Sequence, residues 1–156
     1  MLQTSKMRTA VFATLAAFVT GSIARGETVT LSKLSIHRQG SPVGDTIESI
    51  SFKIDGADAK GLKCSAKEFP FPEPVKIHGC GNSDYAFSLW PGEHGADFQV
   101  MIYHDVGDSH ADLRGGKDIP TVCDNSQGSG PADEICTQKK AVSFKIDGPV
   151  GSGPGL

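Results

Sequence analysis

Apolar and polar residues alternate through most of the chain, and this pattern predicts short β-strands. Its clearest instance is the sequence Ser-Phe-Lys-Ile-Asp-Gly, which occupies positions 51–56 and again 143–148. In both copies Phe and Ile share one side of the predicted strand while Ser and Lys share the other, as in a strand with one buried face. The Asp-Gly pair ends each strand, because glycine adopts positive φ values at little cost. Matching strands early and late in the chain favour a sheet that closes on itself or packs as a sandwich.

The same alternation predicts further strands. After Leu31 the buried positions change parity, which indicates a bulge near Ser32 and Lys33. In a later segment we expect Val75 and Ile77 to face the core. The polar stretch 105–121 is expected to be a loop, and no segment has convincing helical periodicity. The predicted strands cover residues 28–37, 47–54, 62–66, 75–80, 85–90, 96–104 and 135–146.

Strands separated by regular turn signals predict an all-β fold, a compact antiparallel β-barrel or sandwich. We expect this domain to occupy residues 25–147. Residues 148–156 are rich in Gly and Pro and have little to bury, so they are expected to form a flexible tail.

Residues 1–24 have the pattern of a secretory signal peptide. Lys6 and Arg8 precede an uncharged apolar run at 9–19, and Ser22 and Ala24 occupy the −3 and −1 positions of a cleavage site. The run is shorter than the roughly 20 apolar residues of a membrane span. The competing interpretation is an N-terminal core helix. The signal peptide predicts a secreted, extracellular protein.

The net charge argues against two classes of partner. The leader holds two of the 15 basic residues and none of the 18 acidic ones, so the mature chain has 13 basic residues, 18 acidic residues and a formal charge of −5. The sequence also has no run of basic residues. Nucleic acids and anionic membranes bound by charge are therefore not expected partners.

Four cysteines in an exported chain predict two disulfides. Spacing alone allows three connectivities, of which Cys64–Cys80 and Cys123–Cys136 are favoured because each joins segments that look like neighbours across one loop. Each bond would close a loop of about 15 residues and stabilise the fold by roughly 3 kcal/mol. A zinc site is the competing interpretation, but the spacing of a zinc motif does not occur.

Several residue sets carry the chemistry of metal binding or catalysis without matching a known motif. Asp105, Asp108, His110 and Asp112 resemble a divalent-ion loop, and the segment 114–117 offers an anion backbone donors and two cations. A secreted hydrolase such as a ribonuclease would need at least two histidines, or a His–Glu pair, in one cleft. Because no spacing supports these alternatives, we assign no catalytic, metal-binding or cofactor-binding residues. The candidate acid–base residues are His37, His78, His94, His104, His110, Glu48, Glu68, Glu73 and Glu93.

Four aromatic residues are candidate contacts for a partner. Trp90 falls on the polar side of its strand, and Tyr103 lies outside on the next one. Phe69 and Phe71 belong to a proline-rich segment, 69–74, which is expected to lie outside the sheet as a polyproline-like connection. There the two phenylalanines either cap one end of the core or form an exposed docking surface.

Several short motifs lie around the cysteines. They are Cys64-Ser65-Ala66, Cys80-Gly81-Asn82-Ser83, Phe87-Ser88, Pro120-Thr121-Val122-Cys123 and Gly130-Pro131-Ala132-Asp133 before Cys136. Together these residues resemble the Alternaria major allergen family. The resemblance covers roughly residues 29–146. It implies a compact β-barrel, pairing of Cys64 with Cys80 and of Cys123 with Cys136, and secretion to the fungal wall or plant apoplast.

The resemblance also implies a function, because the plant-pathogen branch of that family includes elicitors of the hypersensitive response. We therefore expect an elicitor or effector, not an enzyme, that binds a plant protein such as a membrane receptor or a thaumatin-like defence protein. Some family members are associated with flavonoids, and a carrier of an apolar small molecule is a further alternative. The allergens have an additional cysteine that links two chains. Here no cysteine precedes Cys64, so a disulfide-linked dimer is not expected.

Overall fold

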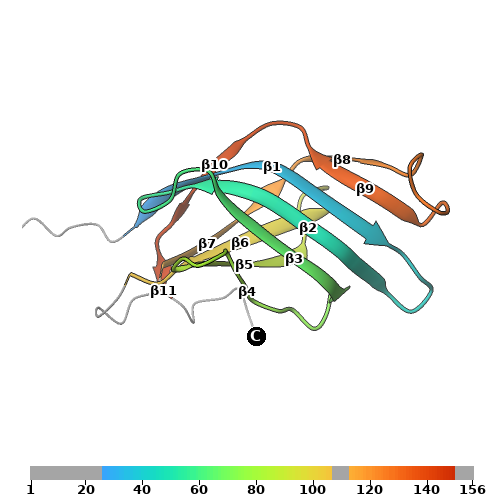
Figure 1. The fold of residues 1–156 in the computed structure, drawn as a ribbon, viewed down its shortest axis with the longest axis horizontal. Helices are drawn as coiled ribbons and strands as arrows, with labels where there is room; N and C mark the ends of the chain where they lie inside the picture. The colour runs from blue at the N-terminus through green and yellow to red at the C-terminus, as the bar shows by residue number, and fades with distance from the viewer. Residues whose placement is uncertain (1–25, 107–112, 150–156) are drawn as a thin grey trace, which may run out of the picture.

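The computed structural model describes residues 26–106 and 113–149, which form two antiparallel β-sheets (Figure 1). The all-β prediction is confirmed. No helix in these two ranges is long and apolar enough to cross a membrane. The predicted signal peptide and most of the predicted tail lie outside the described residues.

The first sheet contains the longest strands. They are β1 (Glu27–Gln39), β2 (Asp45–Asp55) and β3 (Leu62–Phe71), joined by β8 (Thr121–Asp124) and β9 (Asp133–Gln138) in the order β3-β2-β1-β9-β8. The strand β10 (Val142–Ile146) pairs with the first half of β1, and β9 pairs with the second half. Figure 1 shows β10 and β9 at opposite ends of β1.

The predicted bulge in β1 is confirmed, because the register with β2 shifts between Ser32 and Ser35. The side chain of Gln138 on β9 fits into it: its Oε1 accepts a hydrogen bond from the backbone N–H of Leu34 at 3.1 Å, and its Nε2 donates to the backbone oxygen of Leu31 at 3.1 Å. The bulge lets both Leu31 and Leu34 face the core although they are three residues apart.

The second sheet is built from shorter strands. It contains β4 (His78–Gly79), β5 (Tyr85–Pro91), β6 (Phe98–His104), β7 (Leu113–Ile119) and β11 (Gly148–Pro149), in the order β11-β7-β6-β5-β4. The end of the chain leaves the first sheet after β10 and joins the second through β11. This crossing closes one side of the structure.

The core lies between the two sheets. Phe52 on β2 meets Phe87 on β5 with ring centroids 4.9 Å apart, and Phe71 on β3 meets Phe98 on β6 at 5.6 Å. Burying a side chain of this kind contributes roughly 1.5–3 kcal/mol. Both copies of the repeated sequence direct Phe and Ile into this core, as predicted: Phe52, Ile54, Phe144 and Ile146 are all buried.

Both predicted disulfides form. Cys64 on β3 is bonded to Cys80, which precedes β5, so this bond joins the two sheets. Cys123 and Cys136 are direct partners across the β8–β9 hairpin.

Two expectations about apolar residues are wrong. The segment of Phe69 and Phe71 belongs to β3 rather than lying outside the sheet. Both side chains are buried, with 5% and 7% of their surface exposed, which agrees with the alternative that they cover the core and contradicts an exposed docking surface. The chain tolerates Pro70 there because β3 is at the edge of its sheet, where the N–H that proline lacks is not needed for a hydrogen bond to a second neighbouring strand. Conversely, Ile77 is 62% exposed, and only His78–Gly79 of the predicted strand at 75–80 pairs with a neighbour.

Other boundaries also differ from the prediction, and the strand β8 was not predicted. The stretch expected to be a loop contains β7, the predicted strand at 135–146 is divided into β9 and β10, and Gly148 belongs to β11 rather than to a free tail. The strand β7 escaped prediction because its middle, from Gly115 to Lys117, has no apolar alternation. Only Leu113 and Ile119 are buried.

Gly115 allows β7 and β10 to approach closely. A Cβ atom there would clash with the backbone oxygen of Lys145, whereas a Cβ at the neighbouring Gly116 would meet only the ends of flexible side chains, Met101 Cε at 3.0 Å and Gln99 Oε1 at 3.5 Å. We therefore expect Gly115→Ala to lower the free energy of unfolding by about 1–3 kcal/mol, because backbone must move. Gly116→Ala is the matched control and should change it by less than about 1 kcal/mol. Urea denaturation measures both variants, and equal effects would contradict the close approach.

Candidate functional site

The outer face of the second sheet bears a group of large side chains that we call the aromatic patch: Trp90, Met101 and Tyr103. The registers place Trp90 opposite Gln99 and Met101 opposite Ser88. Tyr103 lies two residues from Met101 and therefore on the same face. All three side chains of the patch are half-buried. The sequence predicted Trp90 and Tyr103 as contacts, and the structure brings them to one surface.

Ser88 holds the two aromatic side chains in place. Its side chain is fully buried, and its Oγ accepts a hydrogen bond from Trp90 Nε1 at 2.8 Å. The same Oγ lies 3.0 Å from the hydroxyl oxygen of Tyr103. The polar ends of both rings are thus satisfied from within, which leaves the exposed parts of the rings for a partner. Fixed rings lose little conformational entropy on binding.

The neighbours of the patch supply a polar border. Arg114 is the cross-strand partner of Tyr103, and Asp118 is that of Gln99. Arg114 Nη2 is buried and has no hydrogen-bond partner within the described part of the chain. Trp, Tyr, Met and Arg are the residue types enriched at the centres of protein interfaces. Sequence reasoning missed Ser88 and Arg114, because register across three strands brings them to the patch.

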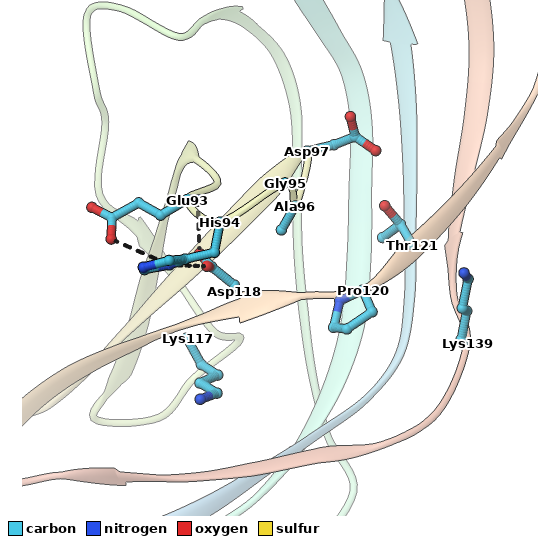
Figure 2. Close-up of a pocket in the computed structure, with 10 residues that line it drawn as sticks. All are labelled: Glu93, His94, Gly95, Ala96, Asp97, Lys117, Asp118, Pro120, Thr121 and Lys139. Carbon is cyan, nitrogen blue, oxygen red and sulfur yellow. Dashed lines mark hydrogen bonds and ion pairs between the residues drawn. The ribbon is translucent and has the colours of Figure 1, made fainter.

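A groove of about 410 Å³ with several charged residues in its lining lies at the end of the second sheet, next to Asp118 (Figure 2). On one side His94 Nδ1 lies 3.6 Å from Asp118 Oδ2 and 3.9 Å from Glu93 Oε2. Asp97 and Lys139 are on the other side in Figure 2. The groove therefore contains a His–Glu pair, as the hydrolase alternative requires. With 87% of its side chain exposed, however, His94 is not enclosed.

The other histidines lie in separate places. His104 is buried and its Nδ1 is 2.7 Å from Glu27 Oε2, while the hydroxyl of Tyr85 donates to Glu27 Oε1 at 2.8 Å. Burial raises the pKa of Tyr85 to about 12.

His78 packs between the rings of Phe69 and Phe87. Burial, with a smaller effect of Lys76, lowers the pKa of His78. His110 lies outside the described residues.

His37 is held between two carboxylates on the first sheet. Its Nε2 is 2.5 Å from Asp133 Oδ1 and its Nδ1 is 3.3 Å from Glu48 Oε2. The other oxygen of Asp133 accepts hydrogen bonds from the backbone N–H and the hydroxyl of Ser129, at 2.7 and 2.9 Å. These bonds, first that of the Ser129 backbone and then that of His37, lower the pKa of Asp133. The arrangement fixes the loop between β8 and β9.

Of the two ion-site alternatives considered from the sequence, the structure describes only one in full. The segment at 114–117 is part of β7 rather than an anion-binding loop. Of the acidic cluster, Asp108, His110 and Asp112 lie outside the described residues. One other group in the described ranges, Cys123, Glu134 and Cys136, has metal-ligand atoms close together. Because both of its sulfur atoms are in a disulfide, it offers a metal a single carboxylate.

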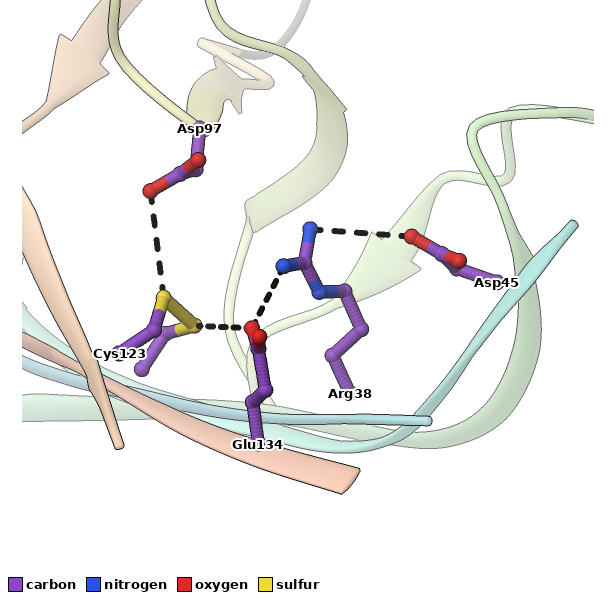
Figure 3. The surroundings of a disulfide bond; sticks show 6 residues. Arg38, Asp45, Asp97, Cys123 and Glu134 are labelled. Atoms are coloured by element: carbon purple, nitrogen blue, oxygen red, sulfur yellow. Dashed lines mark hydrogen bonds and ion pairs between the residues drawn. A yellow bond between two sulfur atoms is a disulfide. The ribbon is translucent and has the colours of Figure 1, made fainter. Parts of the chain in front are cut away.

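Figure 3 shows this disulfide within a chain of charged side chains. Cys123 Sγ lies 3.9 Å from Asp97 Oδ2, and Cys136 Sγ lies 4.0 Å from Glu134 Oε2. Glu134 also accepts a hydrogen bond from Arg38 Nη2 at 2.6 Å. Disulfide sulfurs have no proton to donate, so their approaches to the two carboxylates are not hydrogen bonds, and within this group the Arg38–Glu134 bond ties the β8–β9 hairpin to β1.

Comparison with known proteins identifies the family. The model of the Alternaria alternata allergen 1 family matches residues 31–136, which include the whole aromatic patch. The chain belongs to this family. This confirms the prediction, made from the residues around the cysteines, that the chain resembles this family.

Individual relatives agree with this assignment. The effector protein PevD1 of Verticillium dahliae is 34% identical over 102 residues, which cover 65% of this chain and 61% of PevD1, less than two thirds of its length. Two crystal structures of the Alternaria alternata allergen Alt a 1 superpose with TM-scores of 0.57 and 0.58 at 22% identity. They cover 78% and 80% of this chain, and 94% and 92% of the allergen chains. At this identity the superpositions show a shared fold.

The lowered pKa of Asp133 predicts a pH-dependent contribution to stability. A carboxyl group whose pKa is lower in the folded than in the unfolded state stabilises the fold above its unfolded value, and this contribution is lost as the pH falls through the folded value. Asp133→Asn should therefore destabilise the protein at pH 6, and its difference from the wild type should shrink below about pH 4.

Urea denaturation at pH 6 and pH 3 measures this effect. Asp84→Asn is the control, because the exposed side chain of Asp84 makes no hydrogen bond in the described part of the structure. A difference between Asp133→Asn and the wild type that stays constant over this pH range would contradict the prediction.

Proposed function

We propose that the protein is a secreted fungal effector and elicitor, which triggers plant defence by binding a host protein through the aromatic patch, without catalysis of its own. Family membership and the similarity to the effector PevD1 support the class of function. The single observation that supports the mode of action is the preorganised patch of Trp90, Met101 and Tyr103 around the buried Ser88. A plant receptor at the host membrane or a thaumatin-like defence protein is the proposed partner.

The patch has the composition and the rigidity of a binding centre. Its rings are amphipathic, and the polar ends of both rings already contact Ser88 Oγ, so a partner can cover the rings without breaking these hydrogen bonds. The border of Gln99, Arg114 and Asp118 provides polar contacts around an apolar centre, as in interfaces whose rim excludes water from the central residues.

A variant of the patch tests the proposal. Trp90→Ala combined with Met101→Ala removes two of its three large side chains and should raise the protein concentration needed for a response in infiltrated leaves by at least about tenfold. The matched control is Val43→Ala with Ile77→Ala, which removes apolar side chains that are 97% and 62% exposed elsewhere on the molecule. Circular dichroism verifies the fold of both. A patch variant as potent as the wild type would overturn the proposed mode of binding.

The groove with His94 and Glu93 makes the hydrolase alternative directly testable. Acid–base catalysis needs a group held in a fixed position against the substrate, and the exposed His94 lacks such enclosure. We expect no turnover of RNA or of wall polysaccharides above a blank. Turnover that His94→Ala abolishes would replace the binding proposal with an enzymatic one.

The carrier alternative needs an open interior. Phenylalanine rings from the two sheets instead meet in the middle of the described structure, Phe52 with Phe87 and Phe71 with Phe98. This contact argues against a hollow barrel.

A further inference from the structure

The outer face of the β2–β3 hairpin is rich in lysine and serine near the turn. Three directly opposed cross-strand pairs there are Ser49–Lys67, Ser51–Ser65 and Lys53–Lys63, and a fourth outward pair, Thr46–Pro70, lies farther along the hairpin. The buried neighbours Ile50, Phe52 and Ile54 establish that these positions face away from the core. We call this surface, defined by Lys53, Lys63, Lys67 and the three serines, the lysine face.

The lysine face is not neutralised from within. Lys53, Lys63 and Lys67 are exposed, and within the described residues none of them forms an ion pair. Lys53 and Lys63 lie directly opposite each other, with Cβ atoms about 5 Å apart, an arrangement in which like charges repel and destabilise the pair. Two of the neighbouring carboxylates have other partners: Asp55 accepts the N–H of Gly61 at 2.7 Å, and Glu48 contacts His37. The exposed Glu68 follows Lys67 in β3, and no ion pair joins the two within the described residues.

The surface extends beyond the hairpin. Ser32 on β1 is the cross-strand partner of Lys53, and the exposed Lys33 follows it in the bulge. Lys145 on β10 is also exposed and pairs with Thr28 on the same side of the sheet. A basic face therefore exists on a chain whose net charge is negative. The sequence does not reveal it, because its lysines alternate with core residues along several strands instead of forming a run.

The spacing of the charges indicates a polymer rather than a single ion. Lys53 and Lys63 are close enough to share one anion, but Lys67 is four residues from Lys63 along β3, about 13 Å away. A ligand that contacts all three must carry anionic groups at intervals. Serine hydroxyls between the lysines can exchange hydrogen bonds with sugar hydroxyls and carboxylates.

We propose that the lysine face binds a polyuronate, a polysaccharide in which each sugar carries a carboxylate. Charge complementarity supports this occupant, and the remaining composition of the face separates it from other polyanions. The six residues that define the face include no aromatic ring on which a nucleic-acid base would stack and no apolar side chain that would enter a membrane. This proposal goes beyond the proposed function, because the face belongs to the other sheet from the aromatic patch.

The test compares two triple variants that remove the same charge. Lys53→Gln, Lys63→Gln and Lys67→Gln together alter the lysine face, while Lys76→Gln, Lys117→Gln and Lys140→Gln alter exposed lysines elsewhere. Binding to unesterified polygalacturonate is measured by titration calorimetry at two salt concentrations. We expect salt-sensitive binding by the wild type, a loss of about tenfold or more in the first variant and a change within about twofold in the control.

Further arms of the experiment identify the source of recognition. Fully methyl-esterified polygalacturonate, which lacks the charges, should not bind. Absence of wild-type binding to the unesterified polymer, or equal losses in the two triple variants, would overturn the proposal. Binding of equal strength to single-stranded polynucleotide or to phosphatidylserine vesicles at the same salt would overturn its assignment to a polyuronate. None of these outcomes bears on the aromatic patch, whose variants keep all lysines, so failure here is distinguishable from failure of the proposed function.

Discussion

The contact of Phe52 with Phe87 across the interior is the constraint on which the other features depend. Side chains alternate along a strand, so a residue fixed in the core forces its neighbours outward. Phe52 thereby places Lys53 on the outer face of the first sheet, and Phe87 places Ser88 on the outward side of the second sheet. The Cys64–Cys80 bond joins the same two sheets covalently. Packing in the core therefore determines which residues each outer face displays.

The two outer faces differ in chemistry, and each follows from the strands beneath it. On the second sheet, the registers of β5, β6 and β7 gather Trp90, Met101 and Tyr103 around one buried hydroxyl. On the first, the β2–β3 hairpin displays lysine and serine. A rigid sandwich can thus offer an apolar centre for a protein and a charged surface for a polymer. The proposed effector activity requires only the former.

Local alternation was enough to predict most strands, the bulge in β1 and the core positions of both repeated sequences, while four cysteines behind a predicted signal peptide indicated two disulfides. The prediction failed where contacts with neighbouring strands determine the structure. The strand β7 has few apolar residues and is held by its neighbours. Phe69 enters the sheet because β3 is an edge strand, which tolerates Pro70. The candidate site was predicted in part. Outward parity identified Trp90 and Tyr103, whereas the role of Ser88 and the gathering of the lysines depend on cross-strand register, which one sequence does not encode locally.

The central claim is that the protein acts through surfaces that exist only when the two sheets are packed together. The most direct test is leaf infiltration of the native protein beside the same protein after reduction and alkylation of both disulfides, with circular dichroism showing that the treated chain is unfolded. The account predicts a defence response to the native protein and none to the unfolded chain. A full response to the unfolded chain would show that a short linear segment is recognised, and would contradict the account.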